Sequence, residues 1–124
     1  HKSNILSHHN IIGNLGEIIA SNFLRDQKNY TILENNWRFS HAEIDIIAKD
    51  KETLVFVEVK TRSSGKFGRP EEFITDKKIL LIQDAANEYM KFVKHEWSIR
   101  FDIISIILRT EQDYDLEHYI DAWW

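Results

Sequence analysis

The stretch VFVEVKTRSSGKFG (residues 55–68) starts as a strand and ends in charges. Its apolar, β-branched and aromatic beginning is typical of a strand buried on both faces. Glu58 and Lys60 nevertheless stand just before the strand ends, and they share a face because alternate strand residues point the same way. The glycines and serines that follow are typical of a loop. Charges at the end of a buried strand need an explanation from their neighbours.

The flanking segments predict an α/β fold with a mixed sheet. Apolar periodicity predicts helices over 11–28 and 75–95, the second with Thr75 as its N-cap. The segment 61–73, which contains the only proline, Pro70, is expected to be a loop. Five segments have the composition of strands: 31–39, 42–48, 53–61, 98–108 and 116–123. The order α-β-β-β-α-β-β predicts an antiparallel meander that continues into a larger sheet, with the helices on one face or on both.

Length and composition set limits on the kind of protein. At 124 residues the chain, 1–124, is expected to be a single domain with a core of its own. The absence of cysteine excludes disulfides, thiolate metal sites and cysteine nucleophiles, and it favours a reducing compartment. No apolar run is long enough to span a bilayer. The sequence therefore predicts a soluble, cytoplasmic protein that does not enter membranes.

Charge is unevenly distributed along the chain. The net charge is −4, which by itself argues against non-specific attraction to polyanions. Residues 111–124 hold five acids and no Lys or Arg, whereas the segment 60–70 holds only bases. Those bases are Lys60, Arg62, Lys66 and Arg69. This basic segment is either a solvated loop or a contact surface for an anion.

The segment AEIDIIA (42–48) also carries carboxylates within an apolar strand. Alternation places Asp45 on the face of Glu43 and puts the two isoleucines around Asp45 on the opposite face. If this strand pairs with the next one, Asp45 and Glu58 can approach to about 5 Å between their Cβ atoms. Two carboxylates that close repel each other unless a cation lies between them.

The cation that suits such a pair is a hard divalent metal. Oxygen ligands without cysteine favour Mg²⁺ or Mn²⁺ over Zn²⁺. Lys60, one step along the strand from Glu58, would lie within reach of a water on that metal. Phosphodiester hydrolysis requires this combination, in which a metal polarises a phosphoryl oxygen and a nearby cation stabilises the water or the developing charge.

A purely structural explanation of the same residues is open. Glu58 and Lys60 would then form an ordinary ion pair on a solvated strand end, and Asp45 would be a cap or an arginine partner. Elsewhere, Tyr89 fits the apolar face of its helix and is expected in the core. Arg100 and Asp102 are expected to form a structural ion pair, and the histidines show no metal-binding spacing.

The motifs together resemble a known family. The chain is similar to the YraN-like family of predicted endonucleases, which lies within the PD-(D/E)XK nuclease superfamily and is related to Holliday-junction resolvases. The resemblance covers nearly the whole chain. The matching motifs are Gly13-x-x-Gly16-Glu17-x-x-Ala20, Glu43-Ile44-Asp45, Phe56-Val57-Glu58-Val59-Lys60-Thr61-Arg62, Phe67-Gly68 with Pro70, Lys78 with Ala85-Ala86 and Tyr89, and Arg100-Phe101-Asp102.

The resemblance implies a restriction-endonuclease-like αβββαβ core with a metal site. The implied metal ligands are Asp45, Glu58 and the backbone carbonyl of Val59, and Lys60 would be the catalytic lysine. Glu17, from the first helix, would be a further ligand or would orient Lys60. The implied cofactor is Mg²⁺ or Mn²⁺.

Three functional hypotheses follow. The first is a metal-dependent endonuclease acting on DNA, at branched or otherwise non-duplex structures, for which a homodimer would be suitable. Its nucleic-acid contacts would be Arg62, Lys66, Arg69 and Lys78. The second is a non-catalytic nucleic-acid-binding or accessory protein that retains the nuclease fold. The third is an interaction module that self-associates through its acidic C-terminal segment and Trp123-Trp124.

Overall fold

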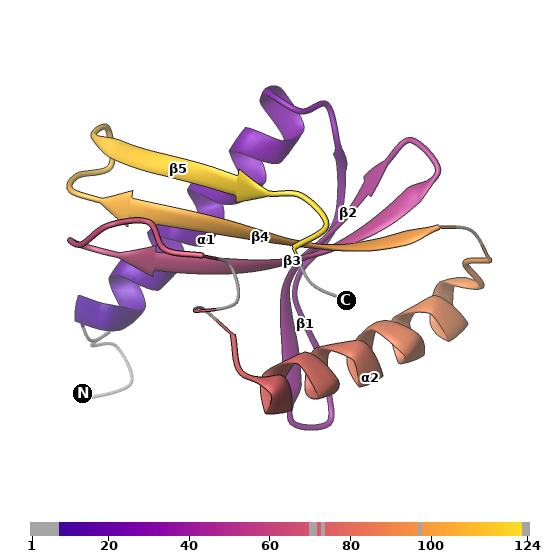
Figure 1. Cartoon of the computed structure of the whole chain (residues 1–124). Helices are drawn as coiled ribbons and strands as arrows, with labels where there is room; N and C mark the ends of the chain where they lie inside the picture. The colour runs from indigo at the N-terminus through magenta and orange to yellow at the C-terminus, as the bar shows by residue number, and fades with distance from the viewer. Residues whose placement is uncertain (1–7, 70–71, 73, 97, 123–124) are drawn as a thin grey trace, which may run out of the picture.

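The computed structural model describes residues 8–69, 72, 74–96 and 98–122 (Figure 1). Pro70, Trp123 and Trp124, which entered the sequence-based hypotheses, lie outside this part of the chain. The helices and strands are α1 (His8–Asp26), β1 (Thr31–Phe39), β2 (Ala42–Asp50), β3 (Thr53–Arg62), α2 (Asp76–Val93), β4 (Ile99–Leu108) and β5 (Tyr114–Tyr119). Neither helix, over the described residues, has the length and hydrophobicity needed to cross a bilayer.

The predicted order of elements is confirmed. Thr75 is the N-cap of α2, and its side chain accepts a hydrogen bond from the Lys78 N–H at 3.2 Å. The first helix begins earlier than the apolar periodicity predicted, at His8. The last strand, predicted over 116–123, is observed over Tyr114–Tyr119.

All five strands form one mixed sheet in the order β1-β2-β3-β4-β5. Neighbouring strands are antiparallel except β3 and β4, which run parallel because α2 carries the chain from the end of one back to the start of the other. The antiparallel meander of the first three strands is therefore confirmed. β3 is the central strand, so its apolar residues are buried on both sides.

The two helices cover opposite faces of the sheet (Figure 1). Phe56 points to the face packed by α2, where it contacts Tyr89 and stacks on Phe101. Val57 points to the other face and belongs to the core that includes Leu24 of α1. Helices on both faces explain why β3 is an almost continuous apolar run rather than an alternating one.

Helix α1 lies unusually close to the end of β3. Gly16 is the point of contact, because a Cβ atom at this position would overlap the side chain of Thr61. The other glycine of the helix, Gly13, has open space where a Cβ would be. The close approach at Gly16 holds the next residue, Glu17, near the end of β3.

One expectation for β2 is wrong. Strict alternation predicted Ile44 and Ile46 on one face, but Ile44 packs in the core formed with α2 and Ile46 packs in the core formed with α1. β2 pairs with β3 only from Ile46 onward, whereas its pairing with β1 continues to Ala42. The first half of β2 is therefore free to twist away from β3 towards α2.

A buried ion-pair network joins several elements on the α1 side of the sheet. Asp102 has no solvent exposure and accepts hydrogen bonds from Arg100 at 2.8 and 2.9 Å and from the Asp121 N–H at 3.0 Å. His118 Nε2 lies 2.8 Å from the same carboxylate. Arg100 also contacts Asp50 of β2 at 3.2 Å. The expected structural ion pair between Arg100 and Asp102 is confirmed.

Candidate active site

The site forms where β2 and β3 separate. Backbone pairing between them ends at Ile46 opposite Val57, and one further step would set Asp45 opposite Glu58. Beyond this point the Asp45 side chain supplies the hydrogen-bond acceptor that the β2 backbone no longer offers to β3, because its Oδ2 accepts a hydrogen bond from the Val59 N–H at 2.8 Å. A carboxylate thus ends the ladder where a main-chain carbonyl would otherwise continue it.

Asp45 and Glu58 are brought together in a buried position. Asp45 is 9% exposed and Glu58 is 6% exposed. Burial, followed by the hydrogen bond to Glu58 and its negative charge, raises the pKa of Asp45 far above its usual range. The Val59 N–H acts in the opposite direction but does not offset these effects. The proximity of the two carboxylates that the strand pattern predicted is therefore present.

A lysine from the second helix joins the pair. Lys78 Nζ, at the first turn of α2, lies 2.5 Å from Glu58 Oε2. The Glu58 charge, together with that of Asp45, outweighs the effect of burial and raises the pKa of Lys78. The structural explanation of an ion pair between Glu58 and Lys60 is therefore incorrect, since the observed partner of Glu58 is Lys78. Apart from this ion pair, Glu58 Oε2 is buried without a hydrogen-bond partner among the described residues.

Lys60 and Glu17 lie at the margin of the pair. Lys60 is exposed, one step beyond Glu58 on the same face of β3. Glu17 is half-buried on α1; burial raises its pKa, a hydrogen bond with Asn36 lowers it, and the charges of Glu43 and Glu58 raise it again. Glu17 thus interacts electrostatically with the pair. No three His, Cys, Asp or Glu side chains within the described ranges come close enough together to hold a metal ion.

The donor atoms present fit a hard divalent cation. Apart from its contact with Lys78, Glu58 Oε2 is a buried carboxylate oxygen without a hydrogen-bond partner among the described residues, and the surroundings of Asp45 disfavour the charged form of its carboxyl group. The N–H and C=O of one strand residue face the same neighbour, so the Val59 carbonyl faces the side on which Asp45 lies. Two carboxylates and a carbonyl are the oxygen ligands that Mg²⁺ and Mn²⁺ prefer.

In the basic segment predicted to contact nucleic acid, Arg62 makes contacts within the protein, whereas the later basic residues are exposed to solvent. Arg62 is directed into its own loop, because its Nη2 donates to the Lys66 carbonyl at 3.0 Å and approaches Ser105 Oγ at 3.5 Å. Lys66 and Arg69 are exposed. Tyr119 anchors the loop to β5 by donating its hydroxyl hydrogen to the Gly68 carbonyl at 3.0 Å. Arg62 therefore braces the loop, and the exposed charges are those that follow it.

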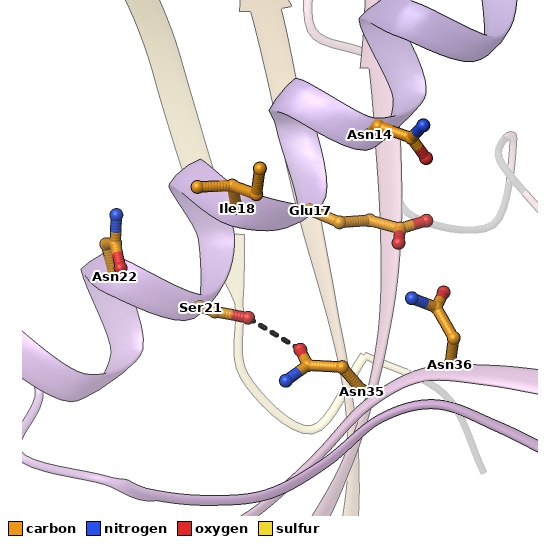
Figure 2. A pocket seen from close by; sticks show the side chains of 7 residues that line it. All are labelled: Asn14, Glu17, Ile18, Ser21, Asn22, Asn35 and Asn36. Carbon is orange, nitrogen blue, oxygen red and sulfur yellow. Dashed lines mark hydrogen bonds between the residues drawn. The ribbon is translucent and has the colours of Figure 1, made fainter. Parts of the chain in front are cut away.

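A cleft lies beside each helix, and each is lined by a residue that interacts electrostatically with the carboxylate pair. The cleft near α2 has a volume of about 250 Å³, and both Lys77 and Lys78 line it. The cleft between α1 and β1 has a volume of about 480 Å³, and Glu17 forms part of its wall (Figure 2). The pair is thus linked by charge to a basic cleft through Lys78 and to a polar cleft through Glu17.

Sequence reasoning missed the polar cleft. Asn14, Ser21 and Asn22 share one face of α1 with Glu17, and Asn35 and Asn36 lie opposite them on β1. The available signal was the spacing of uncharged polar residues along the helix, at positions where a solvated face usually carries Lys or Glu. Their proximity to Asn35-Asn36 depends on how α1 packs on the sheet.

Comparisons with known proteins identify the family. The model of "Uncharacterised protein family UPF0102" matches residues 16–106, a span that includes Glu17, Asp45, Glu58, Lys60 and Lys78. A UPF0102 protein of Flavobacterium psychrophilum is 44% identical over 119 residues, covering 96% of this chain and 98% of the relative. A UPF0102 protein of Alkaliphilus oremlandii is 42% identical over 115 residues, covering 90% and 97% respectively. The chain therefore belongs to the UPF0102, or YraN, family.

Proposed function

We propose that this protein is a metal-dependent endonuclease that hydrolyses phosphodiester bonds in DNA, at branched or otherwise non-duplex structures. The observation that carries the proposal is the buried pair of Asp45 and Glu58 at the point where β2 and β3 separate. Two buried carboxylates in contact are unfavourable by themselves. Binding a cation between the two carboxylates would offset their mutual repulsion and stabilise the site.

Each residue of the site has a role that its position allows. Asp45 and Glu58, with the Val59 carbonyl, would hold Mg²⁺ or Mn²⁺, which when bound supplies charge neutralisation and polarises a phosphoryl oxygen. Lys60 is exposed one step along β3, where its ammonium orients the attacking water or stabilises the charge that develops on the phosphoryl group. Glu17 would orient Lys60 or serve as a further ligand of the cation.

The surroundings of the pair suit a phosphate backbone. Lys78 is half-exposed, so its ammonium can turn to a substrate phosphate once a cation neutralises Glu58. Lys77 lies in the same cleft, at the N-terminus of an 18-residue helix whose dipole favours anions. Lys66 and Arg69 add exposed positive charge on the loop that follows β3. These contacts recognise the backbone rather than the base sequence.

The test is a cleavage assay with end-labelled single-stranded, duplex, flap and four-way-junction DNA in Mg²⁺ or Mn²⁺. Wild-type protein should cut at least one substrate, and Lys60→Ala and Asp45→Ala should each lower the rate about 100-fold or more. Lys28→Ala, which removes an exposed lysine just after α1, is the matched control and should cut like the wild type. If every substrate stays intact with either metal, the hydrolytic proposal is wrong.

The contact between Lys78 and Glu58 favours a second candidate function. The Lys78 ammonium neutralises part of the negative charge of the carboxylate pair without a metal. A non-catalytic nucleic-acid-binding protein could therefore keep the pair without binding a cation. Salt-dependent DNA binding without cleavage would support this alternative. Cleavage that is lost in Lys60→Ala would exclude it.

A further inference from the structure

The residues that line the cleft between α1 and β1 are mostly polar and uncharged. Six of its lining residues are polar, and Glu17 alone among them is charged (Figure 2). These six are Asn14, Glu17, Ser21, Asn22, Asn35 and Asn36. The volume of about 480 Å³ lies within the range of about 300–1,000 Å³ that small-ligand pockets occupy. The cleft is thus large enough for a compact polar ligand.

The lining chemistry selects against a phosphate. No Lys or Arg is among the described residues that line the cleft, and the Glu17 carboxylate on its wall repels anions. Carboxamides instead offer both donors and acceptors, which is the hydrogen-bonding repertoire of a nucleobase edge. A neutral heterocycle with donors and acceptors on its edge therefore fits the cleft better than the charged backbone does.

Hydrogen bonds orient two of the four carboxamides that line the cleft. Ser21 Oγ donates to Asn35 Oδ1 at 2.9 Å across the cleft (Figure 2). Arg25 Nη2 donates to Asn22 Oδ1 at 2.8 Å. With these oxygens engaged, the NH₂ groups of Asn22 and Asn35 are the groups left to meet an acceptor on a ligand. Fixed donors lose less conformational freedom on binding than mobile ones.

The cleft also has an apolar edge. Ile18 lines it and is 57% exposed, and Ile11, seven residues earlier on the same helix, is 44% exposed. Along this outer face of α1 the exposed residues from Asn10 to Asn22 are asparagine or isoleucine. An exposed isoleucine beside oriented carboxamides provides contact with the flat face of a base while the amides meet its edge.

We propose that this cleft binds an unpaired nucleobase of the strand that is cut at the carboxylate pair. The inference rests on the proposed function and names the substrate feature that the same site recognises. Glu17 makes the connection, since it lines the cleft and its charge acts on both Asp45 and Glu58. A base stacked in a regular duplex must first leave the stack to enter such a cleft. The cleft therefore makes the enzyme select single-stranded or branched DNA over duplex.

The test uses the double variant Ser21→Ala/Asn35→Ala, which removes the hydrogen-bonded pair across the cleft. The matched control is Asn87→Ala, which removes an exposed asparagine of α2 outside the cleft. The probes are a fluorescent single-stranded oligonucleotide, the same oligonucleotide with abasic sites, and a duplex of equal length. Binding is measured by anisotropy with Ca²⁺ in place of Mg²⁺, so that no turnover is needed.

Wild type and Asn87→Ala should bind the single strand at least tenfold more tightly than the abasic strand or the duplex. The double variant should lose about tenfold in affinity for the single strand alone. Equal loss on all three probes would show that the cleft contacts the backbone and would overturn the inference. Unchanged affinity for the single strand, or no binding of it by the wild type, would overturn it as well.

The inference and the proposed function fail in different ways. If wild type cuts DNA but the double variant keeps its preference for unpaired bases, the cleft inference is wrong and hydrolysis stands. If strand binding depends on Ser21 and Asn35 but no substrate is cut, the hydrolytic proposal is wrong and the cleft is a binding site. Shifts of the asparagine side-chain NH₂ resonances in NMR spectra, on adding the single strand, identify the cleft directly and should be absent with the abasic strand.

Discussion

At the scale of single residues, Asp45 has an observed structural role beside the chemical role that we propose for it. Its Oδ2 satisfies the Val59 N–H, a backbone donor that β2 no longer pairs. The same carboxyl group lies buried against Glu58, which raises its pKa. An amide would satisfy the N–H equally well without a second negative charge. An ionisable group at this position is therefore consistent with the metal-binding role that we propose for Asp45.

Asp45→Asn tests this separation of roles. The asparagine Oδ1 can still accept the Val59 N–H, and a neutral amide replaces a buried group whose charged form is disfavoured, so without metal the free energy of unfolding should stay equal or rise by about 1 kcal/mol. Added Mn²⁺ should raise the melting temperature of the wild type but not that of the variant. Denaturant unfolding and thermal melts with EDTA or Mn²⁺ make both measurements.

The control for this variant is Asp84→Asn, which makes the same change at an exposed position of α2. It should retain the wild-type response to Mn²⁺. A variant at Asp45 that is destabilised by more than 2 kcal/mol, or that still responds to Mn²⁺, would show that the carboxylate has a structural role instead.

At the scale of elements, the docking of α1 on β3 depends on one glycine. An alanine at a helix interior is normally favoured over glycine by about 1 kcal/mol. At Gly16 the added methyl group would overlap Thr61, so the helix must shift and Gly16→Ala should destabilise the protein by about 1–3 kcal/mol. Gly13→Ala is the matched control, because open space surrounds that position and the helix propensity should prevail.

The two glycine variants separate packing from propensity in one denaturation experiment. The free energy of unfolding should fall in Gly16→Ala and should rise, or stay equal, in Gly13→Ala. Because Glu17 follows Gly16, the first variant should also displace a wall of the polar cleft and weaken single-strand binding. Equal effects of the two substitutions would contradict the close contact between α1 and β3.

The elements were predictable to the extent that their signals are local. Apolar periodicity identified both helices, strand-like composition identified the five strands along the chain, and Thr75 was recognised as a cap because capping acts over three residues. The contact between Asp45 and Glu58 followed from strand pairing. The side chosen by each helix, the separation of β2 from β3 and the Lys78 partner of Glu58 depend on contacts distant in sequence. These had no local pattern to reveal them.

At the scale of the whole molecule, the Asp102 network joins β4 to β2, to β5 and to the segment after α1. Arg100 reaches Asp50 of β2 and the hydroxyl of Tyr30, which follows α1. His118 connects β5 to the Asp102 carboxylate, and the Asp121 N–H connects the segment after β5 to the same carboxylate. The carboxylate of Asp102 lies at the centre and is fully buried. Its ionisation state should therefore affect global stability rather than one local contact.

The pH dependence of unfolding tests this role. Burial alone would raise the pKa of Asp102, but hydrogen bonds from His118, Arg100 and the Asp121 N–H lower it below its usual value. A carboxyl group whose pKa is lower in the folded state stabilises the fold fully above its unfolded pKa of about 3.9, and this contribution is lost as pH falls through the folded value. Asp102→Asn should destabilise the protein by about 3 kcal/mol at pH 7. It should also make the free energy of unfolding less dependent on pH below about pH 4.

Asp113→Asn, at an exposed carboxylate paired with Arg109, should keep the acid dependence of the wild type. If the curves of Asp102→Asn and wild type run parallel from pH 7 to pH 2, the acid sensitivity arises elsewhere, and the network connects the elements without controlling their response to pH.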